Sequence, residues 1–458
     1  MVLSFDFMVI GGGTGGLRTA LYAASHGKKT VMIEPGMIGG TCLNYGCIPT
    51  KALLHSVHVY HLAKNAKEFG VNASKVSYSF KGIMKRMKAI VKDGQNHIKG
   101  SIKAPNLTVI RKPAKFVSPN SIQAGNETYQ ADKIVIATGS KTTIFPIPGL
   151  KETGFMTSDD VLKLEKLPKS LIIIGGGYIS MELATFFNGL GCKVTILERL
   201  PRCLAVLDQD ITDYLTQGYI DEGVEIHTNA NIMQIKKQKG KVVVEANDVR
   251  DPNSKKVIYK AEKLLLSVGR SPNIEGLNLE TAGVKLDARK AIDVNQFMQT
   301  SNPNIYAIGD VNGKGPFAHG AKRESKVCLE HSFGGTSMSI NYDLMPYAVF
   351  TDPPIAGIGL GEQQAKDKGY DTGILKAEFK RAGRATIIGD IRGFVKVVYD
   401  KKTDKIVGAF IIGPNADDII HEFVALMNSA SPTTDVLREM IHIHPTLSEV
   451  MEALKSVS

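Results

Sequence analysis

The sequence has few cysteines and no long hydrophobic run, and each shortage excludes a class of protein. Five cysteines in 458 residues are an odd number, and too few for a disulfide framework at this size. No apolar stretch approaches the roughly 20 residues that span a bilayer, and the opening MVLSFDFMVIGGG lacks the basic n-region of a signal peptide. We therefore expect no signal peptide, no membrane span and a cytoplasmic protein. In the cytoplasm a stable structural disulfide is unusual, but a catalytic disulfide is not.

Positive charge is in excess, with 56 basic against 45 acidic residues and a net charge of +11. The most concentrated basic segment is residues 81–103, in which apolar side chains recur at helical spacing: Ile83, Met84, Met87, Ile90 and Val91. This pattern predicts a helix that buries one face and exposes its lysines, and a solvated face is the favoured interpretation. Docking to an acidic partner is the alternative. Nucleic-acid binding is not expected, because no aromatic residues are interleaved with the charges.

One pattern occurs twice, in residues 7–34 and again in residues 171–198. Each copy reads as an apolar strand, a glycine turn, a helix and a second strand that ends in an acid. The turns share a G-x-G followed by a small residue at the sixth position: Gly11, Gly13, Gly16 and Gly175, Gly177, Ser180. The first glycine permits the tight turn, the second lets the backbone approach a pyrophosphate, and the third position allows close helix packing.

The acids that close the two copies are Glu34 and Glu198, placed where a carboxylate holds an adenosine ribose hydroxyl. Two complete units with terminal acids predict two bound dinucleotides. The carboxylate of Glu198 favours the free 2′-hydroxyl of NAD and repels the 2′-phosphate of NADP, although Arg199 and Arg202 lie nearby and would soften that preference. We therefore expect NAD at the second unit.

The order of the segments predicts an α/β fold with two Rossmann-like dinucleotide-binding domains and a C-terminal α+β domain. The first nucleotide domain is expected to cover residues 1–145, and the second residues 146–272. Residues 273–344 return to the first domain, because the apolar strand there ends in a Gly-Asp pair. β-rich segments with two helices form the last domain, residues 345–458.

The segment GGTCLNYGCIPTK places Cys42 and Cys47 five positions apart. Residues at this separation rise about 7.5 Å along an α-helix, more than the roughly 6.8 Å that disulfide Cα atoms span. The pair therefore bridges only if the helix is broken between the two cysteines. Gly46 relaxes the backbone there, and Pro49 favours a helical restart. Lys51 then lies one turn beyond Cys47, where its ammonium would lower a thiol pKa.

Two other interpretations of the cysteines stay open from the residues alone. Zinc binding is one, because histidines follow at steps of three on the next helix: His55, His58 and His61. Such steps rotate around a helix, so these histidines do not share one face, and we expect no metal site. Inert buried thiols are the other interpretation, and this state is expected of the three lone cysteines: Cys192, Cys203 and Cys328.

The C-terminal segment IHIHPTLSEVMEAL, residues 441–454, offers a proton acceptor. Pro445 is expected to start a helix, which leaves His444 at its cap and Glu449 about one turn inside. A carboxylate there reaches back to orient the imidazole and stabilises its charged form. His442 is expected to point the other way and to be structural. On these residues alone, a structural role is also the default for His444.

Further motifs follow GGTCLNYGCIPTK in order: ATGS (137–140), SVGRSPN (267–273), IYAIGDV (305–311), FTDPPIAGIGL (350–360) and HPTLSE (444–449). Together they resemble the pyridine-nucleotide disulfide oxidoreductases over essentially the whole chain. The resemblance implies a homodimer, with the last domain as its dimerisation domain. It also implies a catalytic disulfide in which Cys47 faces FAD and Cys42 exchanges with substrate. The pair His444 and Glu449 would then serve the cysteines of the other subunit.

The resemblance also assigns cofactor contacts to individual positions. FAD would be bound by residues of the first unit and of the returning segment: Gly11, Gly13, Gly16, Glu34, Thr41, Lys51, Ala114, Thr138, Gly139, Asp310 and Ala318. The nicotinamide dinucleotide would be bound through the second unit: Gly175, Gly177, Glu198 and Gly269. Glu182 would pair with Lys51 near the flavin.

The expected substrate is a small dithiol or disulfide, with dihydrolipoamide, free or on a lipoyl domain, as the first choice. CLNxGCIP with Glu198 favours it, and the end MEALKSVS lacks the cysteine pair typical of mercuric-ion reduction. Tyr45, Tyr178 and Ser180 depart from the dihydrolipoamide pattern, so NAD(P)H-dependent reduction of another low-molecular-weight disulfide, or of mercuric ion, stays the alternative. A flavin-binding scaffold is the alternative outside the enzymes, and the intact cysteines and histidine oppose it.

Overall fold

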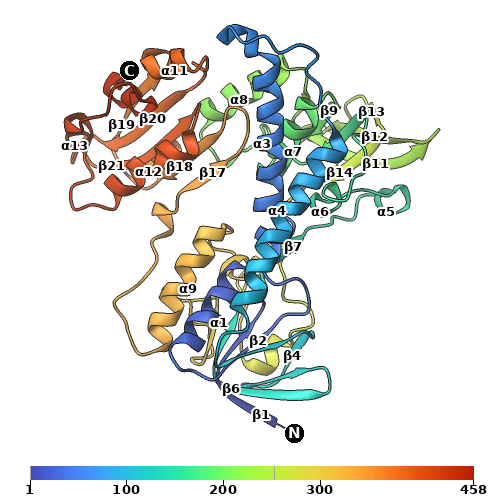
Figure 1. Cartoon of the computed structure of the whole chain (residues 1–458), viewed down its shortest axis with the longest axis vertical. Helices are drawn as coiled ribbons and strands as arrows, with labels where there is room; N and C mark the ends of the chain where they lie inside the picture. The colour runs from blue at the N-terminus through green and yellow to red at the C-terminus, as the bar shows by residue number, and fades with distance from the viewer. Residues whose placement is uncertain (1, 252, 458) are drawn as a thin grey trace. The chain divides into compact units, whose positions relative to one another are not determined.

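A computed structural model describes residues 2–251 and 253–457 (Figure 1). The chain divides into two compact units, each assembled from three separate segments. The first unit contains the chain up to Ala52, Gly82–Thr143 and Gly269–Tyr342. The second contains Leu53–Lys81, Ile144–Val268 and the chain from Asp343 onward. Each of the two glycine-turn motifs therefore lies in a unit of its own.

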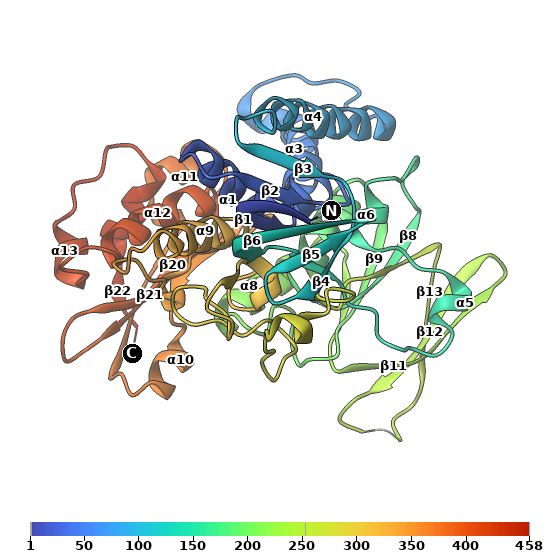
Figure 2. The same ribbon diagram turned by 90° about the horizontal axis from the view of Figure 1, so that it is seen from below.

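The first unit is built on a seven-stranded sheet with the order β3-β2-β1-β6-β5-β4, in which β16 also pairs with β6 (Figure 2). The parallel strands are β1 Val2–Ile10, β2 Thr30–Ile33, β3 Leu107–Ile110, β6 Glu127–Ile136 and β16 Ile305–Ala307. The antiparallel strands are β5 Ser121–Ala124 and β4 Ala114–Ser118. Two helices pack against each other in this unit, α1 Thr14–Ser25 and α9 Ala318–Ser332. Strands covered on both faces, such as β2, are fully buried, which explains their continuous apolar sequence.

The second unit contains a four-stranded parallel sheet with the order β10-β9-β8-β14. Its strands are Glu225–His227, Lys193–Leu197, Ser170–Ile174 and Lys263–Leu266. Helix α7, Tyr178–Gly189, follows β8, and α8, Gln209–Asp221, precedes β10. A three-stranded antiparallel sheet is inserted before β14: β11 Ala230–Gln238, β12 Lys241–Asp248 and β13 Val257–Ala261.

The C-terminal part of the second unit is a six-stranded antiparallel sheet with the order β17-β18-β21-β20-β19-β22. The strands are Tyr347–Val349, Ile355–Gly359, Ile406–Ile412, Phe394–Asp400, Thr372–Glu378 and Lys455–Ser456. Helix α12, Ala416–Met427, covers this sheet with its buried apolar face. Two nucleotide-binding α/β folds and an antiparallel α+β part confirm the predicted fold class.

The basic segment forms the helix α4, Phe80–Ser101, as its periodicity predicts. Met84 and Met87 are buried, and the lysines of the helix are exposed. Among the residues that the structure describes, no helix combines the length and the apolar character needed to cross a membrane.

Candidate active site

The first glycine turn, between β1 and α1, has no room for side chains. Gly11 has a φ of +106°, and a Cβ there would overlap the carbonyl oxygen of Ala137. A Cβ at Gly16 would overlap the carbonyl oxygen of Gly11. Gly13 precedes α1, and no side chain caps that helix. The exposed backbone amides of the helix N-terminus therefore suit a phosphate group.

Glu34 follows β2 and lies beside this turn. Its carboxylate accepts hydrogen bonds from the backbone N–H of Gly12 at 2.7 Å and of Gly36 at 2.6 Å. These bonds fix the carboxylate and leave it lone pairs with which to accept from a ribose hydroxyl. Glu198 is held in the same way in the second unit, by the N–H groups of Gly176 and Leu200.

Polar groups gather at the carboxyl ends of β6 and β16 in the first unit. The buried Thr138 hydroxyl has no hydrogen-bond partner within the described part of the chain. Ser140 donates to the Asp310 carboxylate at 2.5 Å, and Arg270 donates to the Ser140 hydroxyl at 2.8 Å. An unpaired hydroxyl, a fixed carboxylate and a bare glycine turn fit the hydroxyl and phosphate groups of a dinucleotide.

The remaining residues expected to contact FAD lie in this unit as well: Thr41, Lys51, Ala114, Gly139 and Ala318. Ala318 is the first residue of α9, and Ala114 begins β4. Their contacts with the cofactor stay predictions.

The two cysteines lie on either side of a helix break, as predicted. Cys42 belongs to the short helix α2, Gly40–Asn44, and Cys47 begins α3, Cys47–Lys64. The cysteines are free thiols, each half-buried. We call residues 38–47, which carry both cysteines, the redox loop. A Cβ at Gly40 would lie 2.7 Å from the Cα of Gly13, so the redox loop packs directly on the glycine turn. The thiols are thereby held beside the predicted flavin site.

Asn44 anchors the redox loop, a role that the sequence reasoning missed. Its side-chain amide donates to the carbonyl oxygens of Ile38 at 3.2 Å and Gly40 at 2.9 Å. Gln95 of α4 donates to the Ile38 carbonyl at 2.7 Å and to the Asn44 side-chain oxygen. The sequence shows Asn44 as a turn residue but gives no signal that Gln95 meets it.

A hydrogen bond joins the two thiols, and their surroundings give them different acidities. The pKa of the Cys42 thiol is lowered to about 6, chiefly by a hydrogen bond from Cys47 and also by a hydrogen bond with Thr14 and the charges of Lys322 and Lys51, against the effect of burial. The same hydrogen bond and burial raise the pKa of Cys47. The first thiolate therefore forms on Cys42, the thiol expected to exchange with substrate. Lys322 was not predicted, because it comes from α9, far away in the sequence.

His444 and Glu449 form the predicted pair, with 2.7 Å between Nδ1 and Oε1. The pKa of Glu449 is lowered by this bond and by the backbone N–H of Thr446, so it is an ionised acceptor, Nδ1 carries the proton and Nε2 is left as the base. The His444 side chain is 80% exposed, whereas that of His442 is 5% exposed. His444 is thus open to solvent, whereas His442 is enclosed beside Glu422 and Glu452.

The predicted helix start at Pro445 is wrong. The helix is a 3₁₀ segment, Leu447–Ala453, and Thr446 is its N-cap. Glu449 reaches back to the Thr446 N–H at 2.7 Å as the acid of a capping box. The Thr-x-x-Glu spacing that signals this box is present in the sequence and was overlooked. His444 therefore precedes the cap, and the capping acid is also its partner.

The second glycine turn repeats the features of the first. A Cβ at Gly175 would overlap the carbonyl oxygen of Ser267, and Gly177 precedes α7 without a side-chain cap. Arg202 donates to the carbonyl oxygens of Ala205 and Leu207, each at 3.1 Å. Its guanidinium is thus engaged inside its own loop, which weakens the expectation that it softens the NAD preference.

Two other predicted residues are placed without a test of their roles. Glu182 is buried in the second unit and accepts the Phe350 N–H at 3.1 Å. Its pairing with Lys51 stays a prediction, as does the contact of Gly269, which has a φ of +107°.

Glu324 is a buried acid that the sequence reasoning missed. It accepts the Gly309 N–H at 2.5 Å, the Asn312 amide at 3.0 Å and the Tyr342 hydroxyl at 2.6 Å. Burial raises the pKa of Glu324 to about 7. Because Gly309 precedes Asp310, Glu324 fixes the turn that presents that carboxylate.

The lone cysteines are buried, and burial raises the pKa of both Cys192 and Cys203 to about 12. Cys328 is buried as well. His55 and His58 stack with 5.9 Å between ring centroids, whereas His61 bonds to the Gly189 carbonyl oxygen at 2.9 Å. Within the described ranges, no three His, Cys, Asp or Glu side chains are grouped as metal ligands.

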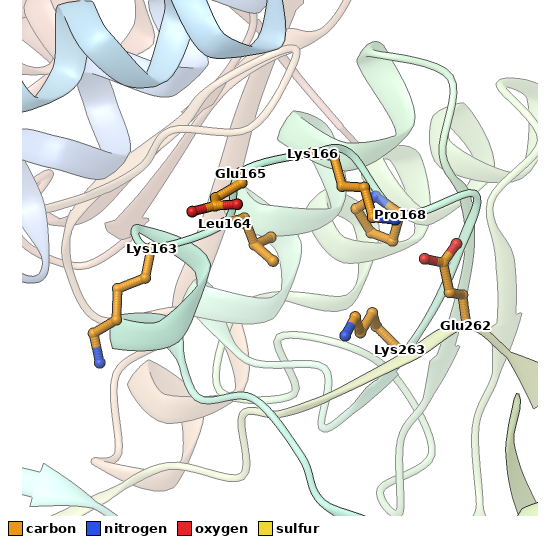
Figure 3. A pocket seen from close by; sticks show the side chains of 7 residues that line it. All are labelled: Lys163, Leu164, Glu165, Lys166, Pro168, Glu262 and Lys263. Atoms are coloured by element: carbon orange, nitrogen blue, oxygen red, sulfur yellow. The ribbon is translucent and has the colours of Figure 1, made fainter. Parts of the chain in front are cut away.

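A cavity of about 460 Å³ lies in the second unit, and Figure 3 shows the side chains that line it. It is lined by Lys163, Leu164, Glu165, Lys166, Pro168, Glu262 and Lys263. These residues lie near the amino ends of β8 and β14. Open parallel sheets bind ligands at the opposite, carboxyl ends, where the Gly175 turn lies, so this cavity is not the nucleotide site.

Comparison with known proteins agrees with this geometry. Residues 5–325 match the family described as pyridine nucleotide-disulphide oxidoreductase, and residues 345–454 match its dimerisation domain. The chain belongs to the pyridine nucleotide-disulphide oxidoreductases. Members of this family typically bind FAD and use NAD(P)H.

Individual relatives of this oxidoreductase differ in substrate. A dihydrolipoyl dehydrogenase of Geobacillus stearothermophilus is 37% identical, over 98% of this chain and 95% of its own. A mercuric reductase of Bacillus cereus is 34% identical, over 97% of this chain and 70% of its own. The solved Cu(II) complex of the HOCl-induced flavoprotein disulfide reductase RclA from Escherichia coli has a TM-score of 0.87 and 31% identity, over 98% and 99% of the two chains.

Proposed function

We propose that this oxidoreductase is a homodimeric, FAD-dependent enzyme that oxidises dihydrolipoamide with NAD⁺. The observation that best supports the reaction class, thiol–disulfide exchange, is the pair of thiols packed on the glycine turn. The His444–Glu449 pair favours an organic dithiol, because such a substrate must lose thiol protons and a metal ion has none. Relatives named as dihydrolipoyl dehydrogenases support the same choice.

In this proposal the residues of the chain move protons and exchange disulfides. His444 takes a proton from one substrate thiol, and the thiolate attacks Cys42 of the Cys42–Cys47 disulfide, which releases Cys47 as a thiolate. The second substrate thiol then attacks the substrate sulfur bound to Cys42, the bond between that sulfur and Cys42 breaks, and the proton of the second thiol passes to the departing Cys42 sulfur. The substrate thus leaves oxidised, and the cysteines hold two electrons. The chemistry that bound FAD supplies is the transfer of these two electrons to NAD⁺. After the hydrogen bond from Cys47, the charge of Lys51 is among the contributions that lower the pKa of the Cys42 thiol and favour its thiolate.

Reduction of a different substrate is the second candidate. The rings of Tyr178 and Tyr347 lie tilted to each other in the second unit, with 6.3 Å between their centroids, and the aromatic side chain of Tyr178 departs from the dihydrolipoamide pattern. Relatives that are named for mercuric ion or described as a Cu(II) complex widen the range to metal ions. A flavin-binding scaffold is the third candidate, and the intact thiols and base oppose it.

A substrate panel with the purified enzyme decides among these candidates. We expect NADH production from dihydrolipoamide and NAD⁺ to exceed the reduction of glutathione disulfide, other small disulfides, mercuric ion and Cu(II). Faster turnover of another panel member would refute the dihydrolipoamide assignment and leave the family unchanged. Bound FAD without any turnover would indicate the scaffold.

The choice of NAD should depend on Glu198. Glu198→Ala should lower kcat/KM for NAD by about 10- to 100-fold, because a hydrogen bond to a charged group is worth roughly 1.5–3 kcal/mol. The loss for NADP should be smaller, since a repulsive charge is removed as well. Steady-state kinetics with both cofactors measure the effect, and Glu225→Ala, which removes an acid paired with Lys193, is the control. A wild-type preference for NADP would contradict the assignment.

A further inference from the structure

The exposed face of α4 carries a row of lysines: Lys85, Lys88, Lys92 and Lys99. They are separated by three, four and seven residues, so they lie on one side of the helix. We call this row the lysine stripe. It extends over about 21 Å, because each helical residue rises 1.5 Å. The only acidic residue of α4 is Asp93.

The stripe has no partner charge within the described residues, whereas several lysines elsewhere in the chain are paired. Lys396 contacts three carboxylates, and Lys376 contacts Asp210 at 3.1 Å. No ion pair involves a lysine of the stripe in the part of the chain that the structure describes. Like charges three and four residues apart destabilise a helix. The like charges of the stripe therefore destabilise α4, and no internal contact offsets this destabilisation. Local destabilisation of this kind is typical of functional surfaces.

The side of α4 that carries Gly94 forms one wall of the redox loop, and Gln95, which falls between Lys92 and Lys99 in the helical spacing, contacts the loop from the edge of the stripe. A Cβ at Gly94 would overlap the Leu43 side chain, so Leu43 fits onto the helix at its glycine. Gln95 bonds to Asn44, and Arg86 donates to the Ala52 carbonyl oxygen at 3.2 Å. A molecule bound along the stripe would thus lie on the outer surface of the helix that supports Cys42.

We propose that the lysine stripe docks an acidic segment of another protein. A membrane surface is disfavoured, because Met84 and Met87 face inward and leave no apolar face to enter lipid. Nucleic acid is disfavoured, because the stripe has neither arginines for bidentate contacts nor aromatic residues for stacking. A second copy that met this surface with its own stripe would place like charges against each other. An acidic helix with carboxylates at the same spacing is complementary in charge and in length.

The test measures the binding of two fluorescent 15-residue peptides to the complete holoenzyme by anisotropy. One peptide is a helix former with glutamates at spacings of three and four, and the other is a scrambled peptide of the same composition. The matched peptide should bind more tightly, and raising salt to 150 mM should weaken it, because the Debye length falls to about 8 Å. The variant Lys85→Glu/Lys88→Glu/Lys92→Glu should weaken binding by at least about tenfold.

The control variant, Lys237→Glu/Lys239→Glu/Lys241→Glu, makes the same charge change on exposed lysines of the β11–β12 hairpin. It should weaken binding less than about twofold. Equal weakening by both variants, or equal binding of the two peptides, would show that binding depends only on net charge and would overturn the proposal. Stripe-dependent binding of duplex DNA or phosphatidylserine vesicles that exceeds binding of the peptide would overturn it as well. Turnover of a free dithiol should be unchanged in both variants, so failure here is separate from failure of the proposed function.

Discussion

Replacing either Cys42 or Cys47 by serine is expected to lower turnover by about 10⁴-fold or more, whichever substrate of the panel the enzyme accepts. Serine keeps the size of the side chain but neither forms the disulfide nor stores two electrons. Initial rates of the purified variants measure the loss. Cys192→Ser is the matched control, because this buried thiol lies outside the redox loop and should keep normal turnover. Normal turnover by both active-site variants would exclude the disulfide mechanism.

The acidities of the two thiols give this prediction a second readout. Iodoacetamide reacts with thiolates, so alkylation of the reduced protein should accelerate as the pH rises through about 6, where Cys42 loses its proton. Mass spectrometry should locate the first label on Cys42. In Cys47→Ala the largest stabilising bond to the Cys42 thiolate is gone, and the midpoint should move to higher pH. An unchanged midpoint would show that the hydrogen bond does not set the acidity.

The features that the sequence predicts correctly depend on local rules. Each glycine turn is specified within a few residues, since only glycine fits where a Cβ would overlap a carbonyl oxygen, as at Gly11 and Gly175. The break between Cys42 and Cys47 follows from a distance limit on the disulfide together with Gly46. The burial of α4 follows from its periodicity.

The features that were missed depend on packing between distant segments. The charge of Lys322 acts on the Cys42 thiol, and Glu324 bonds to Gly309, only because α9 packs against α1 in the folded unit. The bond between Gln95 and Asn44 joins residues 51 positions apart. The spacing of residues along a single sequence does not predict such contacts between distant segments. The cap at Thr446 is a different case, because its signal is local and present.

Replacing His444 by glutamine is expected to lower dihydrolipoamide oxidation by about 10²- to 10⁴-fold, the usual contribution of a general base. Glutamine acts neither as a base nor as an acid, although it preserves the size of the side chain. Glu449→Gln should cost less, because it removes the acceptor that orients Nδ1 but leaves the imidazole. At high pH a small thiol substrate is already a thiolate and exchanges with the Cys42–Cys47 disulfide without a base. Much of the activity lost in His444→Gln should therefore return at high pH, whereas activity lost through a folding defect would not return.

The exposure of His444, 80% in the single chain, fits a base that serves the cysteines of a second subunit. Hybrid dimers test this arrangement directly. A Cys42→Ser subunit keeps His444, and a His444→Gln subunit keeps both cysteines, so their hybrid contains one intact site if the base acts across the interface. Random mixing makes half of the dimers hybrids with one site each, and should restore about a quarter of wild-type activity from two inactive parents. If the base acts within its own subunit, every site in the mixture lacks one group, and the mixture should stay as inactive as its parents.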